Sequence, residues 1–488
     1  KHALVQEKAY ELLLKSKRQQ YHAIIAEVLE KNFPEFAKAS PEFLAHHFSI
    51  AGKNKEAIEY WIKAGRASLE KSANQEAIIF FNKGLALLSN LPESRERDEL
   101  EFFLQSGKAP ALLTTKGYTD KEVETTYARA AELSEFISDQ PQLALIIRGL
   151  WSQYTVKANH KEATRLAKRL EKISEQVDDV LIWFEAGKAT AGSLFWRGEF
   201  LKAKNKLEAT LKKFDPEVHY KHIYLYSEHP VVSCLTYQAY TLWSLGYADR
   251  AIESATLAIS YARKLNHPFT IAYALGFAAV TYQLNRDVAN TLSIATEAEE
   301  LGAKYGFAFW QTMGTILKNW ALMERGDGDA LKKMELTVKE ARARGQQLWV
   351  SNPLALIAEA YGKINQPEKG LEIICEAIEM SEKNDDLFYA AELYRVKGFL
   401  LEKSGKAADE EIEKNLMRAL DIAQKQSAKN YELRAAGDLA KLKLRQGRRD
   451  AGLKILSETL DWFPPDMETE DVLSAKRLLQ NLQVTAGG

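Results

Sequence analysis

The sequence predicts an all-α fold, a right-handed superhelix of helical hairpins with a period near 40 residues. Three observations predict it. The chain of 488 residues is 46% apolar and 27% charged with only 12 prolines, so it can bury a large core and has few residues that end strands. Residues 238–265 carry two helical patterns divided by a glycine, and this pattern recurs along the chain.

The hairpin is clearest in residues 238–265. Its first helix carries Tyr240 and Trp243, Gly246 ends that helix, and the second helix presents Ala251, Ala255 and further small residues on one face. Small residues let the two helices approach closely, and the aromatic rings fill the remaining space. This packing is typical of tetratricopeptide-like repeats, which need neighbours because a single hairpin cannot bury its apolar face.

The repeat is traced by the small residue that opens each second helix. It is expected at Ala163, Ala203, Ala251, Ala289, Ala330, Gly370 and Gly452, with successive differences of 40, 48, 38, 41, 40 and 82. The last difference is two periods of 41. A standard tetratricopeptide repeat has about 34 residues, so these helices should be longer, and their stacking should create a concave inner face.

The ends of the chain differ from the repeats. Residues 1–32 indicate two helices without the repeat turn, and Trp462-Phe463-Pro464-Pro465 ends the last hairpin before a charged helix at 469–482. We therefore expect four regions, which are a first segment at 1–33, N-terminal helical repeats at 34–142, a superhelix at 143–465 and a C-terminal capping helix and tail at 466–488.

Two stretches carry a family resemblance. The sequence from His2 to Glu7, with Tyr10, Tyr21-His22 and Ile25-Ala26-Glu27, resembles the segment that closes the winged-helix domain of bacterial STAND-type signalling ATPases. Residues 41–92 and later pieces resemble the superhelical repeats of those ATPases that are fused to class III adenylyl/guanylyl cyclases. The resemblance implies that residues 1–33 are the tail of a truncated winged-helix domain. Lys1 in place of Met also indicates an excised fragment.

Catalytic motifs are missing from the sequence. A phosphate-binding loop needs a glycine five positions before its Gly-Lys pair, but Phe102, Ile182 and Leu400 stand there. GxSxG, HExxH and GxGxxG motifs and a cyclase core are also missing. We therefore expect this chain to be no enzyme, to need no cofactor, and neither to bind ATP tightly nor to make a cyclic nucleotide.

One cluster could suggest a metal site, comprising His219, His222, His229 and Cys234 with Asp215 and Glu228 nearby. Imidazoles at i and i+3 can share a divalent metal on one helical face. Two prolines bracket this stretch and the spacing is not compact, so ordinary loop or cap histidines are expected and no metal. Cys234 and Cys375 are far apart and lack a CxxC pattern, which favours a reducing cytoplasm over a disulfide or zinc site.

Charge gives no argument for nucleic acid or membrane partners. The formal net charge is −1, and the basic runs 165–172 and 445–449 lack interleaved aromatic residues. These runs are expected to be solvated helix faces. The two longest uncharged segments, 230–248 and 267–285, contain polar residues throughout and are expected to be buried first helices of repeats.

A ligand site is expected where the first helices of successive repeats begin, because equivalent positions of stacked hairpins form a row. Aromatic rings would pack on an apolar part of the ligand, while Arg395 and Glu392 would orient a polar group or only pair with each other. The expected site on the concave face comprises His229, Tyr237, Gln238, His267, Tyr273, Trp310, Glu359, Glu392 and Arg395.

Three functions follow. The leading one is a non-catalytic sensor and protein-interaction arm of a larger STAND ATPase linked to a nucleotide cyclase, as the resemblance implies. Its partners would be a protein or small-molecule effector on the concave face and the ATPase and winged-helix domains of the parent chain. The alternative is an independent repeat scaffold that binds a peptide of a partner protein. An enzyme that uses the histidine cluster is disfavoured by the missing motifs.

Overall fold

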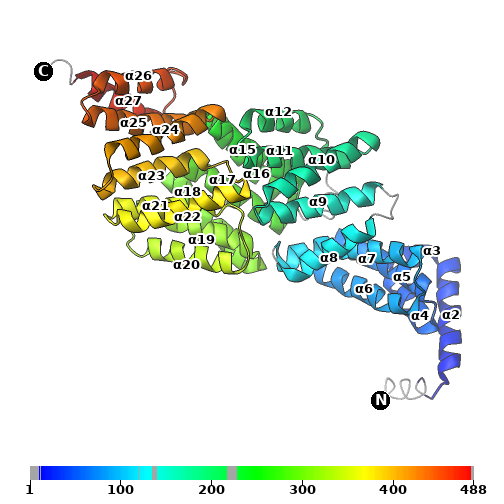
Figure 1. Cartoon of the computed structure of the whole chain (residues 1–488). Helices are drawn as coiled ribbons and strands as arrows, with labels where there is room; N and C mark the ends of the chain where they lie inside the picture. The colour runs from blue at the N-terminus through cyan, green and yellow to red at the C-terminus, as the bar shows by residue number, and fades with distance from the viewer. Residues whose placement is uncertain (1–9, 11, 119, 135–139, 217–227, 485–488) are drawn as a thin grey trace. The chain divides into compact units, whose positions relative to one another are not determined.

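The computed structural model describes residues 10, 12–118, 120–134, 140–216 and 228–484. These residues form helices joined by short turns and include no β-strand, which confirms the all-α prediction (Figure 1). The chain forms two compact units, one made from residues 1–150 and the second mostly from residues 151–488. The four regions expected from the sequence stay a prediction.

The first unit is a stack of helices in chain order. Its interior is tight around Phe81, because a Cβ added at Gly65 or at Gly107 would lie 2.5 Å from the Phe81 ring. Asp120 caps α8 by accepting from the Glu122 N–H at 2.8 Å. The helices are α2 (Lys15–Asn32), α3 (Pro34–Ala39), α4 (Pro41–Ala51), α5 (Asn54–Glu70), α6 (Asn74–Leu87), the 3-10 turn η1 (Leu88–Asn90), α7 (Arg95–Lys116), α8 (Lys121–Leu133) and the start of α9 (Gln140–Val156).

The second unit consists of the predicted hairpins. Gly246 has a positive φ of 94° at the expected turn, in a conformation that L side chains rarely adopt. The helices are α10 (His160–Gln176), α11 (Val180–Trp196), α12 (Phe200–Leu211), α15 (Pro230–Ser244), α16 (Ala248–Leu265), α17 (Pro268–Leu284), α18 (Val288–Tyr305), α19 (Ala308–Glu324), α20 (Ala330–Ala343), α21 (Ser351–Lys363), α22 (Pro367–Asn384), α23 (Ala390–Ser404), α24 (Asp409–Lys425), α25 (Lys429–Arg445), α26 (Arg449–Leu460) and α27 (Glu470–Val484).

One repeat marker was assigned to the wrong residue. Ala163, Ala203 and Ala251 are buried in the first turn of their helices, as predicted, but Ala289 is exposed. Thr291 is the buried residue in the first turn of α18, where its Oγ1 donates to the Asp287 carbonyl at 2.6 Å. A threonine can fill this place because its hydroxyl is satisfied by its own helix, which a search for small apolar residues overlooks.

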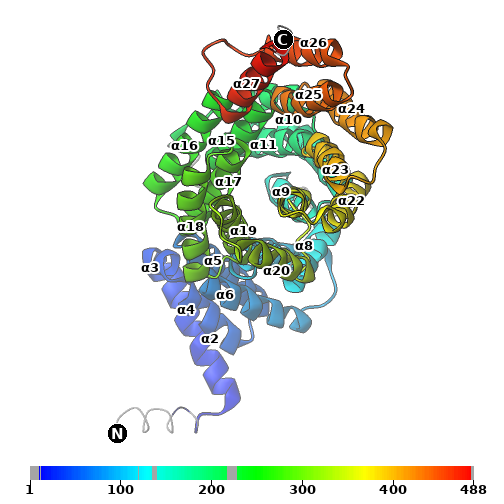
Figure 2. The ribbon, with the colours of Figure 1, turned by 90° about the vertical axis from the view of Figure 1, so that its left-hand side faces the viewer.

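The helices of the second unit wind into a superhelix, seen along its axis in Figure 2, and backbone segments far apart in the chain are hydrogen-bonded. The backbone N–H of Leu348 donates to the Val156 carbonyl at 2.8 Å. The Leu387 N–H donates to the Trp196 carbonyl at 2.8 Å. The Asn430 side chain donates to the carbonyl of Trp243, which is 187 residues earlier, at 2.7 Å. We call this line of contacts the seam.

The seam needs close approach between backbones. A Cβ added at Gly246, in the turn after α15, would lie 2.4 Å from the Trp462 ring and 2.9 Å from the Cβ of Lys429. Simple solenoids contact only neighbouring repeats. In this unit, the turns that follow the first helices also pack against repeats one superhelical turn later.

Candidate ligand-binding site

The residues expected to form one site fall into two groups, and the first is an aromatic core. Trp310 is 2% exposed, and its ring centre lies 4.9 Å from that of Tyr273. Tyr237 is buried as well, and its hydroxyl accepts from Trp196 Nε1 at 3.2 Å. Rings packed this closely against each other offer little surface to a ligand. Their part in ligand binding stays a prediction.

The polar residues of the expected site contact their own or neighbouring helices. His229 is buried against the rings of Phe214 and Tyr261, with ring centres at 6.0 and 5.3 Å. His267 caps α17, since its Nδ1 accepts from the Thr270 N–H at 3.3 Å, and burial lowers its pKa to about 4. The half-buried Gln238 accepts from Ser254 Oγ at 3.1 Å. His229 is thus a buried side chain and His267 a helix cap, and the part of both in ligand binding stays a prediction.

The metal cluster cannot be assembled from the residues that the structure describes. His219 and His222 lie outside them, and Cys234 is buried as a free thiol whose pKa burial raises strongly. Among the described residues, no group of three or more His, Cys, Asp or Glu side chains is placed to hold a metal ion.

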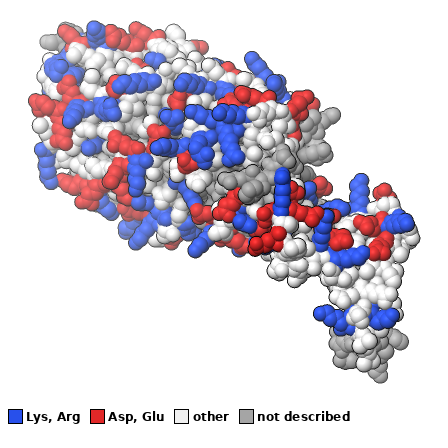
Figure 3. Space-filling model, turned by 45° about the vertical axis from the view of Figure 1, so that its right-hand side comes forward, with Lys and Arg blue, Asp and Glu red and all other residues white. Residues whose placement is uncertain are grey.

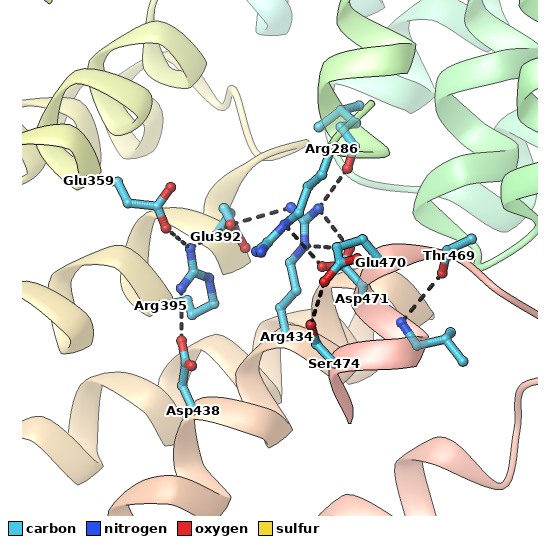
Figure 4. A network of polar contacts seen from close by, with 12 residues as sticks. Arg286, Glu359, Glu392, Arg395, Arg434, Asp438, Thr469, Glu470, Asp471 and Ser474 are labelled. Carbon is cyan, nitrogen blue, oxygen red and sulfur yellow. Dashed lines mark hydrogen bonds and ion pairs between the residues drawn. The ribbon is translucent and has the colours of Figure 1, made fainter. Parts of the chain in front are cut away.

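The second group is a buried charged network around Arg395 of α23 (Figure 4). Its guanidinium donates to Glu359 of α21 at 2.7 Å, to Glu392 of the same helix at 2.8 Å and to Asp438 of α25 at 2.8 Å. Arg395 and Glu392 thus pair with each other within a larger arrangement, and their part in ligand binding stays a prediction. Three neighbouring repeats supply the arrangement.

Sequence reasoning did not find the rest of this network. Arg434 of α25 donates to Asp471 of α27 at 2.7 and 2.8 Å and to the Leu284 carbonyl at 2.6 Å, and its guanidinium lies 4.9 Å from the centre of the Trp243 ring. Arg286, in the turn after α17, lies 3.1 Å from the same Asp471 carboxylate. The network therefore joins two superhelical turns and the C-terminal helix.

The adjacent arginines favour the charged forms of Glu359, Asp438 and Asp471. Burial alone would raise the pKa of Glu359, but the charge of Arg395 outweighs it and lowers the pKa to about 2. Burial likewise opposes ionisation of Asp438 and Asp471, and the adjacent arginines still hold both pKa values below their usual range. Opposite charges within about 4 Å favour the charged forms. A network in this state is held in place by charge at neutral pH.

A pocket of about 410 Å³ opens beside the network. Its walls come from α23, α25, α27 and the turn after α17. Small-molecule sites typically measure about 300–1,000 Å³, so this volume suits a small ligand. The lining residues are Arg286, Arg395, Leu433, Arg434, Gly437, Asp438, Lys441, Asp471, Ser474, Ala475, Arg477, Leu478 and Asn481.

Surface charge is mixed elsewhere. On the face in Figure 3, Lys and Arg side chains are interspersed with Asp and Glu, in line with the formal net charge of −1. No helix among the described residues combines the length and the apolar character needed to cross a membrane.

No family model matches the chain. An uncharacterized protein of Rhizobium meliloti (strain 1021) is 23% identical over 453 residues, which cover 92% of this chain and 44% of that protein. The match is to part of a longer protein. The chain thus spans less than half the length of this relative.

Two solved structures are similar in arrangement only. A Rap protein in complex with competence and sporulation factor has a TM-score of 0.43 and 13% identity, over 88% of this chain and 98% of that chain. Yeast Tom70 has a TM-score of 0.33 and 14% identity, over 97% of each chain. Both scores are below 0.5, so neither structure carries an argument about what this chain binds.

Proposed function

We propose that this chain is a non-catalytic sensor and protein-interaction arm of a larger STAND-type signalling ATPase, with a nucleotide cyclase as the output domain. The observation that carries the proposal is the Arg395 network with its open pocket. A ligand there touches α27, α25 and the turn after α17 together, so binding acts on the contact between superhelical turns. Such a ligand shifts the parent between two states only if it binds them with unequal affinity.

An exposed apolar surface on the first unit supports a parent with further domains. Leu14 is 73% exposed, and Tyr21, Ile24 and Ile25 on α2 are also exposed. Tyr10, just before α2, is 38% exposed and Leu13 is partly covered, whereas residues 4 and 5 lie outside the described part. In our proposal a winged-helix domain of the longer protein covers this surface. The greater length of the Rhizobium relative is consistent with it.

The test compares the full-length parent with residues 1–488. We expect ATP hydrolysis by the parent and none by residues 1–488. Replacing Arg286 and Arg477 by glutamine in the parent should change its ATP hydrolysis by at least about fivefold, the lower end of typical allosteric coupling. The matched control is Arg263→Gln, which removes a guanidinium from an exposed ion pair with Glu297 outside the pocket. Arg395 is avoided because its removal leaves buried carboxylates unpaired.

Three results would contradict the proposal in different ways. Hydrolysis by residues 1–488 would show that the arm is catalytic. Unchanged hydrolysis in the double variant would show that the pocket does not regulate the parent. A parent without ATP hydrolysis would favour the alternative, an independent scaffold that binds a peptide.

A further inference from the structure

The pocket beside the network is lined mainly by cations. Five lining side chains are positively charged and two are negatively charged, namely Arg286, Arg395, Arg434, Lys441 and Arg477 against Asp438 and Asp471. The other carboxylates that pair with these cations, including Glu392 and Glu470, do not line the pocket. The cavity wall is therefore richer in positive charge than the network as a whole. A concave wall of one sign concentrates ions of the opposite sign.

The chain itself places a carboxylate against these arginines. Asp471 receives two N–H groups of Arg434 and lies 3.1 Å from Arg286 Nε. A guanidinium presents its donors in a planar fork that matches carboxylate and phosphate oxygens. Arg395, 5% exposed, also lines the pocket, and its Nε has no hydrogen-bond partner among the described residues. The wall thus has guanidinium groups that suit an oxyanion and one N–H group, that of Arg395 Nε, without a partner among the described residues.

Two of the lining cations belong to exposed side chains, although Arg477 also donates to Ser474 Oγ at 2.9 Å. Arg477 contacts Glu470 at 2.7 Å, but both side chains are at least half exposed, and Lys441 is exposed to a similar extent beside Asp438. Exposed ion pairs contribute little to stability, so exchanging one for a contact with a ligand costs little. Leu433, Ala475 and Leu478 supply an apolar wall next to these cations.

We propose that this pocket binds a small organic anion, a carboxylate or a phosphate with a short apolar part, that connects Arg286 to Arg477 and Lys441. The anion supplies negative charge to a cationic wall and joins the turn after α17 to α27 and α25. Binding therefore tightens the seam between superhelical turns. The regulatory role of this anion rests on the proposed function, to which the inference adds the chemical class of the ligand.

The test uses purified residues 1–488 with phosphate, succinate or citrate as probes, against sodium chloride at equal ionic strength. We expect at least one probe to bind by titration calorimetry, to raise the melting temperature and to slow hydrogen exchange in α27. Binding of phosphate but not of succinate or citrate would identify a phosphate ligand, and the reverse result would identify a carboxylate. The variant Arg286→Gln/Arg477→Gln should bind about tenfold more weakly or worse, because two charge-assisted hydrogen bonds are lost. Arg263→Gln should bind as the unchanged chain does.

Two outcomes would overturn the inference. One is that no probe gives an effect beyond that of chloride at 10 mM, which is about ten times a Kd of 1 mM. The other is that the double variant, folded by circular dichroism, binds a probe as tightly as the unchanged chain. The proposed function is tested by a different result. It fails if the same double variant loses anion binding but leaves ATP hydrolysis by the parent unchanged.

Discussion

At the scale of single residues, the seam contains a carboxylate without a full set of partners. Asp386 is 3% exposed, and its Oδ2 accepts from Ser351 Oγ at 3.1 Å. Its Oδ1 has no hydrogen-bond partner among the described residues, and His160 Nε2 lies 3.7 Å away. Burial raises the pKa of Asp386 to about 7, while burial, with a smaller effect from Arg197, lowers that of His160 to about 3. Both side chains are therefore neutral in mildly acidic solution.

We expect Asp386→Asn to stabilise the protein above neutral pH. The folded state holds the Asp386 proton up to about pH 7, whereas the unfolded state releases it near 3.8, so the unfolding free energy falls as pH rises between these values. Asparagine avoids this loss and can still accept from Ser351. The gain at pH 8 should be up to about 4 kcal/mol and should shrink toward pH 4. Urea unfolding at several pH values measures it, and a gain independent of pH would contradict the assignment.

At the scale of elements, α2 is held to α4 by histidines. His22 Nδ1 and His47 Nδ1 are 2.7 Å apart, and the Tyr10 hydroxyl lies 2.9 Å from the other nitrogen of His22. Two ring nitrogens at this distance share one proton, and both rings cannot be charged without repulsion. Burial, then the charge of His46, lowers the pKa of His22, and burial lowers that of His47 in the same way.

This arrangement predicts that acid loosens α2. A histidine with a lowered folded pKa binds more protons when its surroundings unfold, so its contribution is present above about pH 6.5 and is lost as pH falls below that. Amide exchange in α2 should therefore become faster, relative to α5, between pH 7.5 and pH 5 after correction for intrinsic rates. The variant His22→Gln/His47→Gln should lose this dependence. Equal pH dependence in the variant and the unchanged chain would exclude the histidine pair as its cause.

At the scale of the whole molecule, the second unit departs from a chain of independent repeats. Asn430 donates to the carbonyl of Trp243, and the adjacent Tyr431 ring lies 5.1 Å from the Trp243 ring. In addition, Arg197 pairs with Asp385, 188 residues later, at 2.8 Å. Contacts of this kind couple repeats that are far apart in the chain, so the stability of the unit is not a sum over neighbours alone.

We expect Asn430→Ala to lower protection from hydrogen exchange at a distant place in the chain. The substitution leaves the buried Trp243 carbonyl without this donor, which costs about 1–3 kcal/mol. Amides at the end of α15 should exchange faster, while those of α19, between the two in sequence, should not change. The matched control is Asn290→Ala in α18, where the side chain is exposed and bonds only locally to Asp287. Changes confined to α24–α26 would contradict coupling through the seam.

The sequence by itself determined the hairpins. Gly246 at the turn and small residues in the first turn of most second helices are local features, and helix packing at short range follows from them. The same reasoning identified Arg395, Glu392 and Glu359, because these residues lie in the first helices of adjacent repeats. Their actual contacts agree with one of the two roles foreseen, mutual pairing.

Only the tertiary structure decided which distant residues meet. Arg286, Arg434 and Asp471 come together because a small rotation per repeat accumulates until one superhelical turn touches the next. That rotation depends on how side chains pack between neighbouring hairpins, so it cannot be calculated from the spacing of the repeats along the chain. For the same reason the sequence did not show that Tyr237, Tyr273 and Trp310 are buried against neighbouring rings, or that the cationic pocket lies where α23, α25, α27 and the turn after α17 meet.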